Sequence, residues 1–204
     1  AETRAQYVAH VANMMQLLGH DSGTAAAAAQ TVMDMETALA EASFTAVEAR
    51  NPQNFRRKVD VDEADAALEN FDWSAYLAAA GLGDVERHGM HNEDFWPALD
   101  AVIGDSSLAD IRTYLQWHLV SAMAPYLSSG FVEENFDFYA RKLSGTDEMR
   151  PRWKRVLSTT SGALREALGE AYVERAFSPR AKAKAEEMVQ NLLWAMGEHI
   201  RALP

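Results

Sequence analysis

The sequence predicts an all-α protein built from long amphipathic helices. Apolar residues recur three and four positions apart over most of the chain, which is the periodicity of a helix with one buried face. Helix-start signals stand directly before several of these stretches, at Asp21-Ser22, at Ser107 and at Ser178-Pro179. No stretch alternates apolar and polar residues for long enough to predict a strand with comparable clarity.

Two helices are predicted within residues 7–50. The first has a regular apolar face formed by Tyr7, Val11, Met14, Met15 and Leu18. Gly19 supplies its stop signal, because glycine readily adopts the left-handed conformation that follows many helices. Asp21 or Ser22 caps the second helix, whose apolar face runs through Ala25 to Ala29, Val32, Met35 and Leu39. Asn51-Pro52 is predicted to end this helix.

The signals shorten between residues 54 and 94. A basic patch at 56–58 and an acidic run at 60–65 precede a short helix, which Phe71-Asp72-Trp73 opens and Gly81 closes. Residues 84–90 form the only extended-looking piece. We expect a turn at 81–84 and a loop at 88–94.

The second half gives firmer signals. Ser107 and Asp110 have capping-box spacing and begin a long helix that bends at Pro125. An aromatic-rich helix then ends at Gly145, residues 150–177 form the next element, and Ser178-Pro179 begins the last helix. The apolar stripes of these helices are Leu108, Ile111, Leu115, Leu119 and Met123; Trp153, Leu157, Leu164, Leu168 and Tyr172; and, expected to face inward, Val189, Leu192, Leu193, Met196, Ile200 and Leu203.

Composition restricts the class of function. The 204 residues are 48% hydrophobic and 24% charged, which is ordinary for a globular protein of one large or two small domains. The net charge of −11 disfavours nucleic acid and anionic lipid as partners. The chain has no cysteine, so disulfides and thiolate metal sites are excluded. No apolar run reaches the roughly 18 residues of a membrane span.

His88 and His91 raise the question of a metal site. They lie three apart with Glu93 and Asp94 close behind, and imidazole and carboxylate are usual zinc ligands. Gly89 lies between them and favours a loop, in which this spacing guarantees no convergence. Solvated loop histidines are therefore the favoured interpretation, and a ligand pair is the alternative.

The other titratable candidates carry weaker signals. His10, His20, His118 and His199 have no second ligand four residues away, and His118, next to Trp117, is expected to be packed and hydrogen-bonded. The adjacent pairs Glu133-Glu134 and Glu186-Glu187 diverge around a helix, so solvated faces explain them. The basic cluster from Arg150 to Arg155 favours a salt-bridged surface or a domain contact over an anion site. Residue spacing thus assigns no catalytic or metal-binding residue, and leaves substrate-binding residues unknown.

Five blocks of the sequence resemble neprilysin-type zinc metallopeptidases, the family of neprilysin, the endothelin-converting enzymes and bacterial oligopeptidases. Ser107 to Trp117 is similar to "SLxxIRxYLxW" of that family, and Ala167 to Lys182 to "ALGxLYVExxFxxxxK" with the helix that follows it. The remaining blocks are Tyr7 to Gly19 ("YxxHVxxMLxLxG"), Met35 to Ala40 ("MELExxLA"), and Leu143 to Thr146 with Arg152 to Arg155 ("LxGTxxxxxRWKRC"), where Val156 stands in place of a common cysteine. The order of the blocks also matches, and the resemblance extends over residues 1–204.

The resemblance implies an internal segment of the helical N-terminal lobe of such a peptidase, with 1–204 as a single lobe. The family's His-Glu-x-x-His zinc motif and its Asn-Ala-x-Tyr substrate-binding stretch do not occur in these residues. The implied zinc is therefore expected outside this segment, in a catalytic lobe of the same polypeptide.

Two functions remain open on this basis. The favoured one is a lid or cavity wall that controls the access of short peptides in an exported zinc endopeptidase, periplasmic or extracellular, with a cytoplasmic location as the alternative. The other is a stand-alone helical module that binds peptides or proteins without catalysis. In either case the segment alone is expected to be inactive. Peptide specificity, cavity-facing residues and oligomeric state do not follow from the sequence.

Overall fold

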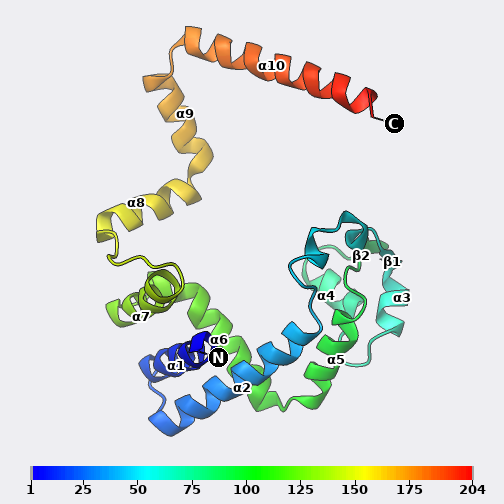
Figure 1. Cartoon of the computed structure of the whole chain (residues 1–204), viewed down its shortest axis with the longest axis vertical. Helices are drawn as coiled ribbons and strands as arrows, with labels where there is room; N and C mark the ends of the chain where they lie inside the picture. Colours follow the sequence, from blue (N-terminus) through cyan, green and yellow to red (C-terminus); the bar gives the residue numbers. More distant parts are fainter. Residues whose placement is uncertain (1, 204) are drawn as a thin grey trace. The chain divides into compact units, whose positions relative to one another are not determined.

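The computed structural model describes residues 2–203 and confirms the all-α class (Figure 1). Its α-helices are α1 (Glu2–Leu17), α2 (Ser22–Glu41), α3 (Val61–Ala66), α4 (Trp73–Ala79), α5 (Phe95–Asp105), α6 (Leu108–Met123), α7 (Ser129–Asn135), α8 (Arg152–Ala163), α9 (Arg165–Ala176) and α10 (Pro179–Arg201). Short 3₁₀ turns are η1 (Glu48–Arg50), η2 (Pro52–Phe55) and η3 (Ala124–Tyr126), and η4 (Phe136–Lys142) is a π-helix.

The chain divides into two compact units, residues 1–147 and 148–204. Unit 1 contains α1 to η4 and unit 2 contains α8 to α10. The single lobe expected over residues 1–204 stays a prediction.

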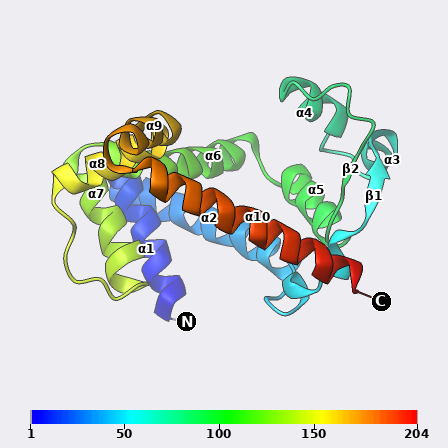
Figure 2. The ribbon, with the colours of Figure 1, turned by 90° about the horizontal axis from the view of Figure 1, so that it is seen from above.

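The main core of unit 1 lies where α1, α2, α6 and α7 gather, as both ribbon views show (Figures 1 and 2). Its centre is Trp117 of α6, which packs with Met14 and Val11 of α1 and Val32 of α2. Ala25 and Ala29 are fully buried on α2. Small side chains let two helix backbones approach closely, which explains why the alanine tract faces α1. The core positions predicted for the first two helices are thus confirmed at their centres.

A second, smaller core in unit 1 surrounds Trp73. Val59, Ala64, Leu68, Leu77 and Met90 pack with it. Here the extended piece predicted at 84–90 is confirmed over β2 (Arg87–Gly89), whereas the loop expected from His88 onward is wrong at its start. The strand β2 pairs antiparallel with β1 (Lys58–Asp60) and brings His88 opposite Val59. A three-residue strand has no detectable period-2 pattern, and only the tertiary pairing stabilises it.

Asp100 ties this smaller core to α5. Its buried carboxylate accepts hydrogen bonds from the backbone N–H groups of Glu69 and Asn70, at 3.0 and 2.7 Å, and from the Asn70 amide at 3.2 Å. Burial acts to raise the pKa of Asp100, and these donors outweigh it, so the net shift is downward. The carboxylate therefore holds the turn after α3 against α5.

The predicted helix starts are confirmed by side-chain caps. Asp21 accepts from the N–H groups of Gly23 and Thr24, and Ser178 accepts from Ala181. Ser107 and Asp110 form a reciprocal capping box. Gly19 adopts a φ of 100°, in the left-handed region, where α1 ends. These local signals are reliable because one side chain and its nearest backbone decide them.

Two predicted helix ends are wrong. α2 ends at Glu41, ten residues before Asn51, because its last carbonyls find other donors: Ser43 Oγ donates to Leu39 and Asn92 Nδ2 donates to Ala42, at 2.9 Å. The single element predicted over 150–177 is broken at Leu164, whose backbone leaves the helical region (φ −112°, ψ 29°) and separates α8 from α9. Gly162, a poor helix former, lies two residues before this break.

Most residues of the apolar stripes predicted for the second half are exposed among the described residues. On α6 the buried residues are Trp117 and Val120, whereas Leu108, Leu115 and Leu119 are exposed. The helices α8, α9 and α10 contain no buried residue, so unit 2 has no core of its own among the described residues, and the expectation that the last helix faces inward stays a prediction. Periodicity identifies an apolar face, but it does not say which element covers that face.

We predict that two truncations separate core from surface in this chain. Met14→Ala should lower the free energy of unfolding by about 2–5 kcal/mol, because it empties a fully buried site. Leu193→Ala should cost less than about 0.5 kcal/mol, because that side chain is exposed. Urea unfolding followed by far-UV circular dichroism would measure both. A cost at Leu193 equal to that at Met14 would show that α10 packs on a core.

Candidate functional site

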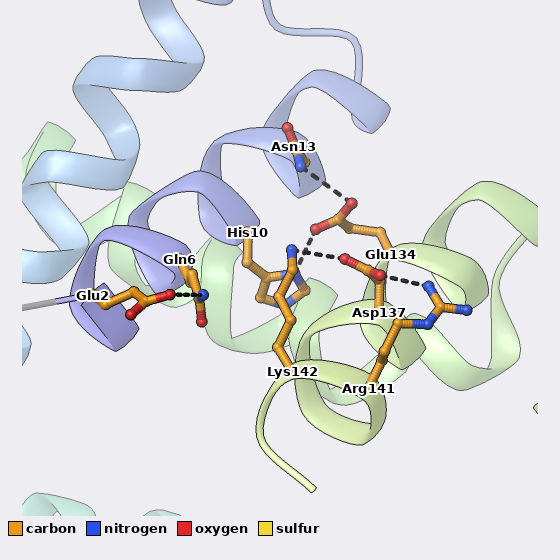
Figure 3. Close-up of polar contacts among 8 residues, drawn as sticks. All are labelled: Glu2, Gln6, His10, Asn13, Glu134, Asp137, Arg141 and Lys142. Atoms are coloured by element: carbon orange, nitrogen blue, oxygen red, sulfur yellow. Dashed lines mark hydrogen bonds and ion pairs between the residues drawn. The ribbon is translucent and has the colours of Figure 1, made fainter. Parts of the chain in front are cut away.

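The most complete polar cluster in unit 1 surrounds His10, where α1 meets α7 and η4 (Figure 3). His10 Nδ1 lies 2.8 Å from Glu134 Oε1, and Asn13 Nδ2 donates to the other carboxylate oxygen at 3.1 Å. The His10 side chain is fully buried, whereas that of Glu134 is 17% exposed. The pair joins residues 124 positions apart in the sequence and closes unit 1.

The π-helix η4 adds a second set of charges beside this pair (Figure 3). The Asp137 carboxylate pairs with Arg141 Nη1 at 2.6 Å and with Lys142 Nζ at 2.7 Å. Lys142 and then Arg141 hold the pKa of Asp137 below its usual range. A π-helix widens the turn, so Arg141 and Lys142, four and five residues on, both reach one carboxylate.

Aromatic rings enclose the His10 imidazole. Phe138 stacks on it with ring centroids 4.6 Å apart, and Trp117 and Tyr139 meet it edge-on at 5.5 Å. His10 Nε2 is buried and has no hydrogen-bond partner among the described residues. Burial lowers the pKa of His10, although the hydrogen bond and charge of Glu134 oppose the shift. We therefore assign a neutral ring that donates from Nδ1 to the carboxylate, with the tautomer inferred from the contacts.

A second network in unit 1 centres on Glu36 of α2. Tyr114 donates to Glu36 Oε1 at 3.2 Å, and His118 Nε2 lies 3.2 Å from the same oxygen. Nearby, Trp117 Nε1 donates to the Tyr7 hydroxyl at 3.0 Å. Burial, and then the charge of Glu36, raises the pKa of Tyr7 to about 12. His118 is thus packed on Tyr114 and lies beside a carboxylate, although its side chain is half-exposed.

Two open clefts border these networks. One, of about 510 Å³, is lined by Asn13, Gln16, Leu17, Gly130, Glu133, Glu134, Asp137 and Arg141. The other, of about 420 Å³, is more apolar and is lined by Thr3, Arg4, Tyr7, Met33, Glu36, Thr37, Ala40, Phe138, Tyr139 and Leu143. Neither lining contains a serine nucleophile with a base, so these clefts offer binding surfaces, not a catalytic constellation.

His88 and His91 pack against different aromatic side chains. The His88 ring lies against Trp73, with centroids 4.3 Å apart, and the His91 ring lies against Phe55 at 5.2 Å. Both rings are half-buried, so the interpretation as solvated loop histidines is wrong. Across residues 2–203, no three histidine, aspartate or glutamate side chains are grouped so that they could hold a metal ion. The described donors therefore do not fit a zinc ion.

The remaining candidates stay dispersed. His199, Glu133, Glu186 and Glu187 are exposed, and His20 is half-buried where α1 turns into α2. Glu134 differs from these residues. It was expected on a solvated face, but its carboxylate pairs with the buried His10 side chain.

The basic cluster of unit 2 makes no ion pair among residues 2–203, so a salt-bridged surface is wrong here. Arg150 and Lys154 instead line an open cleft of about 460 Å³ with Arg165, Ser158 and Ser161. The domain contact and the anion site stay open.

These observations define a class: a mainly helical chain whose buried polar networks hold helices together and whose described residues contain no assembled catalytic site. Comparison with known proteins gives the family. The model of peptidase family M13 matches residues 1–204. The chain belongs to peptidase family M13, and its resemblance to the N-terminal segment of neprilysin-like peptidases is confirmed.

Individual relatives agree with this assignment. Membrane metallo-endopeptidase-like 1 of Mus musculus is 25% identical in an alignment of 199 residues that covers 92% of this chain and 26% of that protein. Endothelin-converting enzyme 1 of Rattus norvegicus is 23% identical over 202 residues, 97% of this chain and 26% of that protein. The open state of Mycobacterium tuberculosis zinc metalloprotease Zmp1 matches with a TM-score of 0.85 and 29% identity, over 100% of this chain and 32% of that chain. The chain thus spans about a quarter of the length of the curated relatives it matches.

Sequence reasoning missed Glu134 and Glu36 as network centres. His10 carried a usable signal: it lies between Tyr7, Val11 and Met14 on the apolar face of α1, and a buried imidazole requires a polar partner. No sequence pattern identified Glu134 as that partner, because it lies 124 residues away.

We predict that His10 makes unit 1 less stable in acid. Its folded pKa lies below its unfolded value, so below about pH 6.5 the unfolded chain takes up a proton that the folded chain does not. Stability is then lost as pH falls from about 6.5 toward the folded pKa, by up to about 1.4 kcal/mol per pH unit. Urea unfolding at a series of pH values should show this slope, and His10→Gln should remove it.

His118→Gln is the matched control for this experiment. It deletes an imidazole that also pairs with a glutamate but is half-exposed. The acid slope should persist in this variant. A slope that survives His10→Gln would assign the proton uptake to another group.

We also predict that this chain does not bind zinc stoichiometrically. Calorimetric titration with Zn²⁺ should show no tight one-to-one site, because no described set of side chains supplies three ligands. His88→Ala and His91→Ala should leave the titration unchanged. A single tight site that either substitution abolishes would contradict the separation of the two rings.

Proposed function

We propose that this chain is the helical lobe of a zinc metalloendopeptidase, and that it limits the access of short peptides to a catalytic lobe in the same polypeptide. The observation that carries the proposal is the match over 100% of this chain to Zmp1, a zinc metalloprotease solved in an open state. Because the chain corresponds to only 32% of Zmp1, the chemistry is assigned to the remainder of the longer polypeptide.

The zinc of this proposal is held outside residues 1–204. The His10, Glu36 and His88 neighbourhoods each supply fewer than the three ligands that a catalytic zinc takes from protein. Bound in the other lobe, zinc would activate water and polarise the peptide carbonyl.

The contribution of this chain is a wall with fixed shape. The buried His10–Glu134 pair and the Trp117–Tyr7 hydrogen bond hold α1, α6 and α7 together, so the surface they carry can move as one body. Closing such a wall over a substrate excludes water and large ligands, and opening it releases product. A chamber of this kind admits short peptides and rejects folded proteins.

Charge supports a preference among peptides. The net charge of −11 would attract cationic peptides to an acidic wall, and salt would weaken this attraction. The cleft beside η4 presents three carboxylates, Glu133, Glu134 and Asp137, and one cation, Arg141, which is consistent with that sign.

The same proposal places the protein outside the cytoplasm, by similarity to a membrane metallo-endopeptidase-like protein. Among residues 2–203, no helix combines the length and the apolar character needed to cross a membrane.

We predict that the reading frame beyond residue 204 encodes His-Glu-x-x-His, and that the longer polypeptide hydrolyses peptides only with zinc. A chelator should abolish cleavage and added Zn²⁺ should restore it. The polypeptide should cleave a short flexible peptide but spare the same sequence inside a folded protein, because the chamber excludes the fold.

The matched control is the host protein of that sequence after unfolding. Recovery of cleavage at the same bond would show that size and fold, not sequence, decide access. A longer polypeptide without the zinc motif would contradict the proposal and leave a stand-alone binding module. Equal cleavage of folded and flexible substrates would contradict the role of this lobe in limiting access, but not the zinc-dependent cleavage.

A further inference from the structure

A buried imidazole holds η4 against α1. Phe138 of η4 stacks on the His10 ring, with the centroids 4.6 Å apart and the planes inclined by 11°. Tyr139 of η4 and Trp117 of α6 meet the same ring edge-on, and Glu134 of α7 binds its Nδ1. All of these residues belong to unit 1, and the His10 side chain is fully buried within it. The contact therefore does not depend on the position of unit 2.

η4 is the less firmly packed end of the helical segment that begins with α7. Phe131, near the start of that segment, belongs to the main core. Phe138 is buried but lies outside that core cluster, and its ring neighbours among the described residues are Tyr7, His10 and Tyr139. Segments with few buried apolar contacts open at a lower free energy than a core does. Local opening of unit 1 is therefore expected at η4 before it reaches α1, α2 or α6.

Protonation of His10 creates a donor without an acceptor. In the neutral ring Nδ1 donates to Glu134, and Nε2 is a buried atom that has no hydrogen-bond partner in residues 2–203. A second proton converts Nε2 into a charged N–H donor among aromatic rings. Burying such a donor costs free energy unless it reaches an acceptor. Because Phe138 covers one face of the ring, withdrawal of η4 brings water to the imidazolium.

Charged groups on α7 and η4 face the His10 ring with opposite effects (Figure 3). Glu134 of α7 and Asp137 of η4 favour the imidazolium, whereas Lys142 of η4 opposes it. Asp137 is already paired with Lys142 and Arg141, which balance its charge. Burial is the largest influence, and it lowers the pKa of His10. The closed arrangement therefore favours the neutral ring.

The remaining neighbours of the ring are uncharged near pH 7. Trp117 of α6 has no titratable group, and Tyr139 of η4 is a phenol. Tyr7 lies one helical turn before His10 on α1, and burial followed by the charge of Glu36 on α2 raises the pKa of Tyr7 to about 12. His10 is thus the group of this pocket that changes charge between neutral and mildly acidic pH.

We propose that η4 is an acid-sensitive latch: when His10 takes up a proton, residues 136–142 leave α1 while the start of α7 stays on the main core. Both clefts described for unit 1 have η4 residues in their linings, Asp137 in one and Phe138 in the other. Opening of the latch changes the shape and the charge of both clefts. The inference does not rest on the proposed function, because every contact that carries it lies within unit 1.

Hydrogen exchange of the whole 204-residue chain tests the latch between about pH 5.5 and 7.5, on either side of the ordinary histidine pKa. Each rate is divided by the intrinsic rate of an unstructured peptide at the same pH, because the exchange chemistry itself depends on pH. Protection of the peptide 136–143 should fall by up to about tenfold toward the acid end, since one proton is taken up on opening. This protection should be lower than that of α6 at every pH and insensitive to dilute urea, because local opening exposes little surface.

Two near-isosteric substitutions identify the titrating group. His10→Gln keeps an amide donor for Glu134 but takes up no proton, so protection of 136–143 should become independent of pH. Glu134→Gln keeps an acceptor for Nδ1 and removes the other candidate for titration, so the pH dependence should persist. His118→Gln is the matched control, because it deletes a half-exposed imidazole that also lies beside a glutamate, and it should leave the pH dependence unchanged.

Three results would overturn the proposal. Protection of 136–143 that stays constant with pH would show that proton uptake does not open η4. A pH dependence that survives His10→Gln, or is lost in Glu134→Gln, would assign the proton to another group. Equal protection of η4 and α6 at each pH would assign the opening to global unfolding.

A second measurement on the unsubstituted chain covers the case in which His10→Gln does not fold. The imidazole ¹⁵N signals of His10 should show titration below about pH 6.5, because the closed state disfavours the imidazolium. Titration at or above that pH would remove the free-energy difference that drives the latch and would overturn the proposal.

Discussion

The architecture of unit 1 depends on one buried contact, between His10 of α1 and Glu134 of α7. The carboxylate also accepts from Asn13, and the imidazole lies between Phe138, Trp117 and Tyr139. Burying a polar ring costs free energy unless its partner is in place, so this contact specifies one arrangement of the helices. It draws the end of unit 1 onto its beginning and sets the position of η4.

The π-helix follows from that position. A π turn contains one residue more than an α turn. In η4 this spacing lets Phe138 stack on His10 while the adjacent Asp137 pairs with Arg141 and Lys142. Trp117 then links this cluster to the Tyr7 hydroxyl and, through the adjoining Tyr114, to Glu36. The polar groups around His10 and Glu36 thus form two neighbouring networks that hold helices, and neither network contains a nucleophile with its base.

Exposed apolar side chains are distributed unequally between the two units of this M13 chain. Unit 1 has two cores, whereas the helices of unit 2 contain no buried residue. Isolated helices gain most of their stability from tertiary packing, so α8 to α10 have apolar surface to offer to other parts of a protein. A chain that matches only about a quarter of its curated relatives is expected to show such surfaces. Membership of the M13 family therefore accounts for the fold.

The sequence by itself determined the all-α class, the helix starts at Asp21, Ser107 and Ser178, and the stop at Gly19, because each depends on a few neighbouring residues. Ordered motif blocks also determined the family. Only the tertiary structure decided that α2 ends at Glu41, that residues 87–89 pair with residues 58–60, and that Glu134 is the partner of His10. Those outcomes depend on groups far apart in the sequence, such as Asn92 on the Ala42 carbonyl, whose meeting no local pattern encodes. The same reason explains α6, where periodicity revealed the apolar stripe but the packing of Trp117 decided which face is the core.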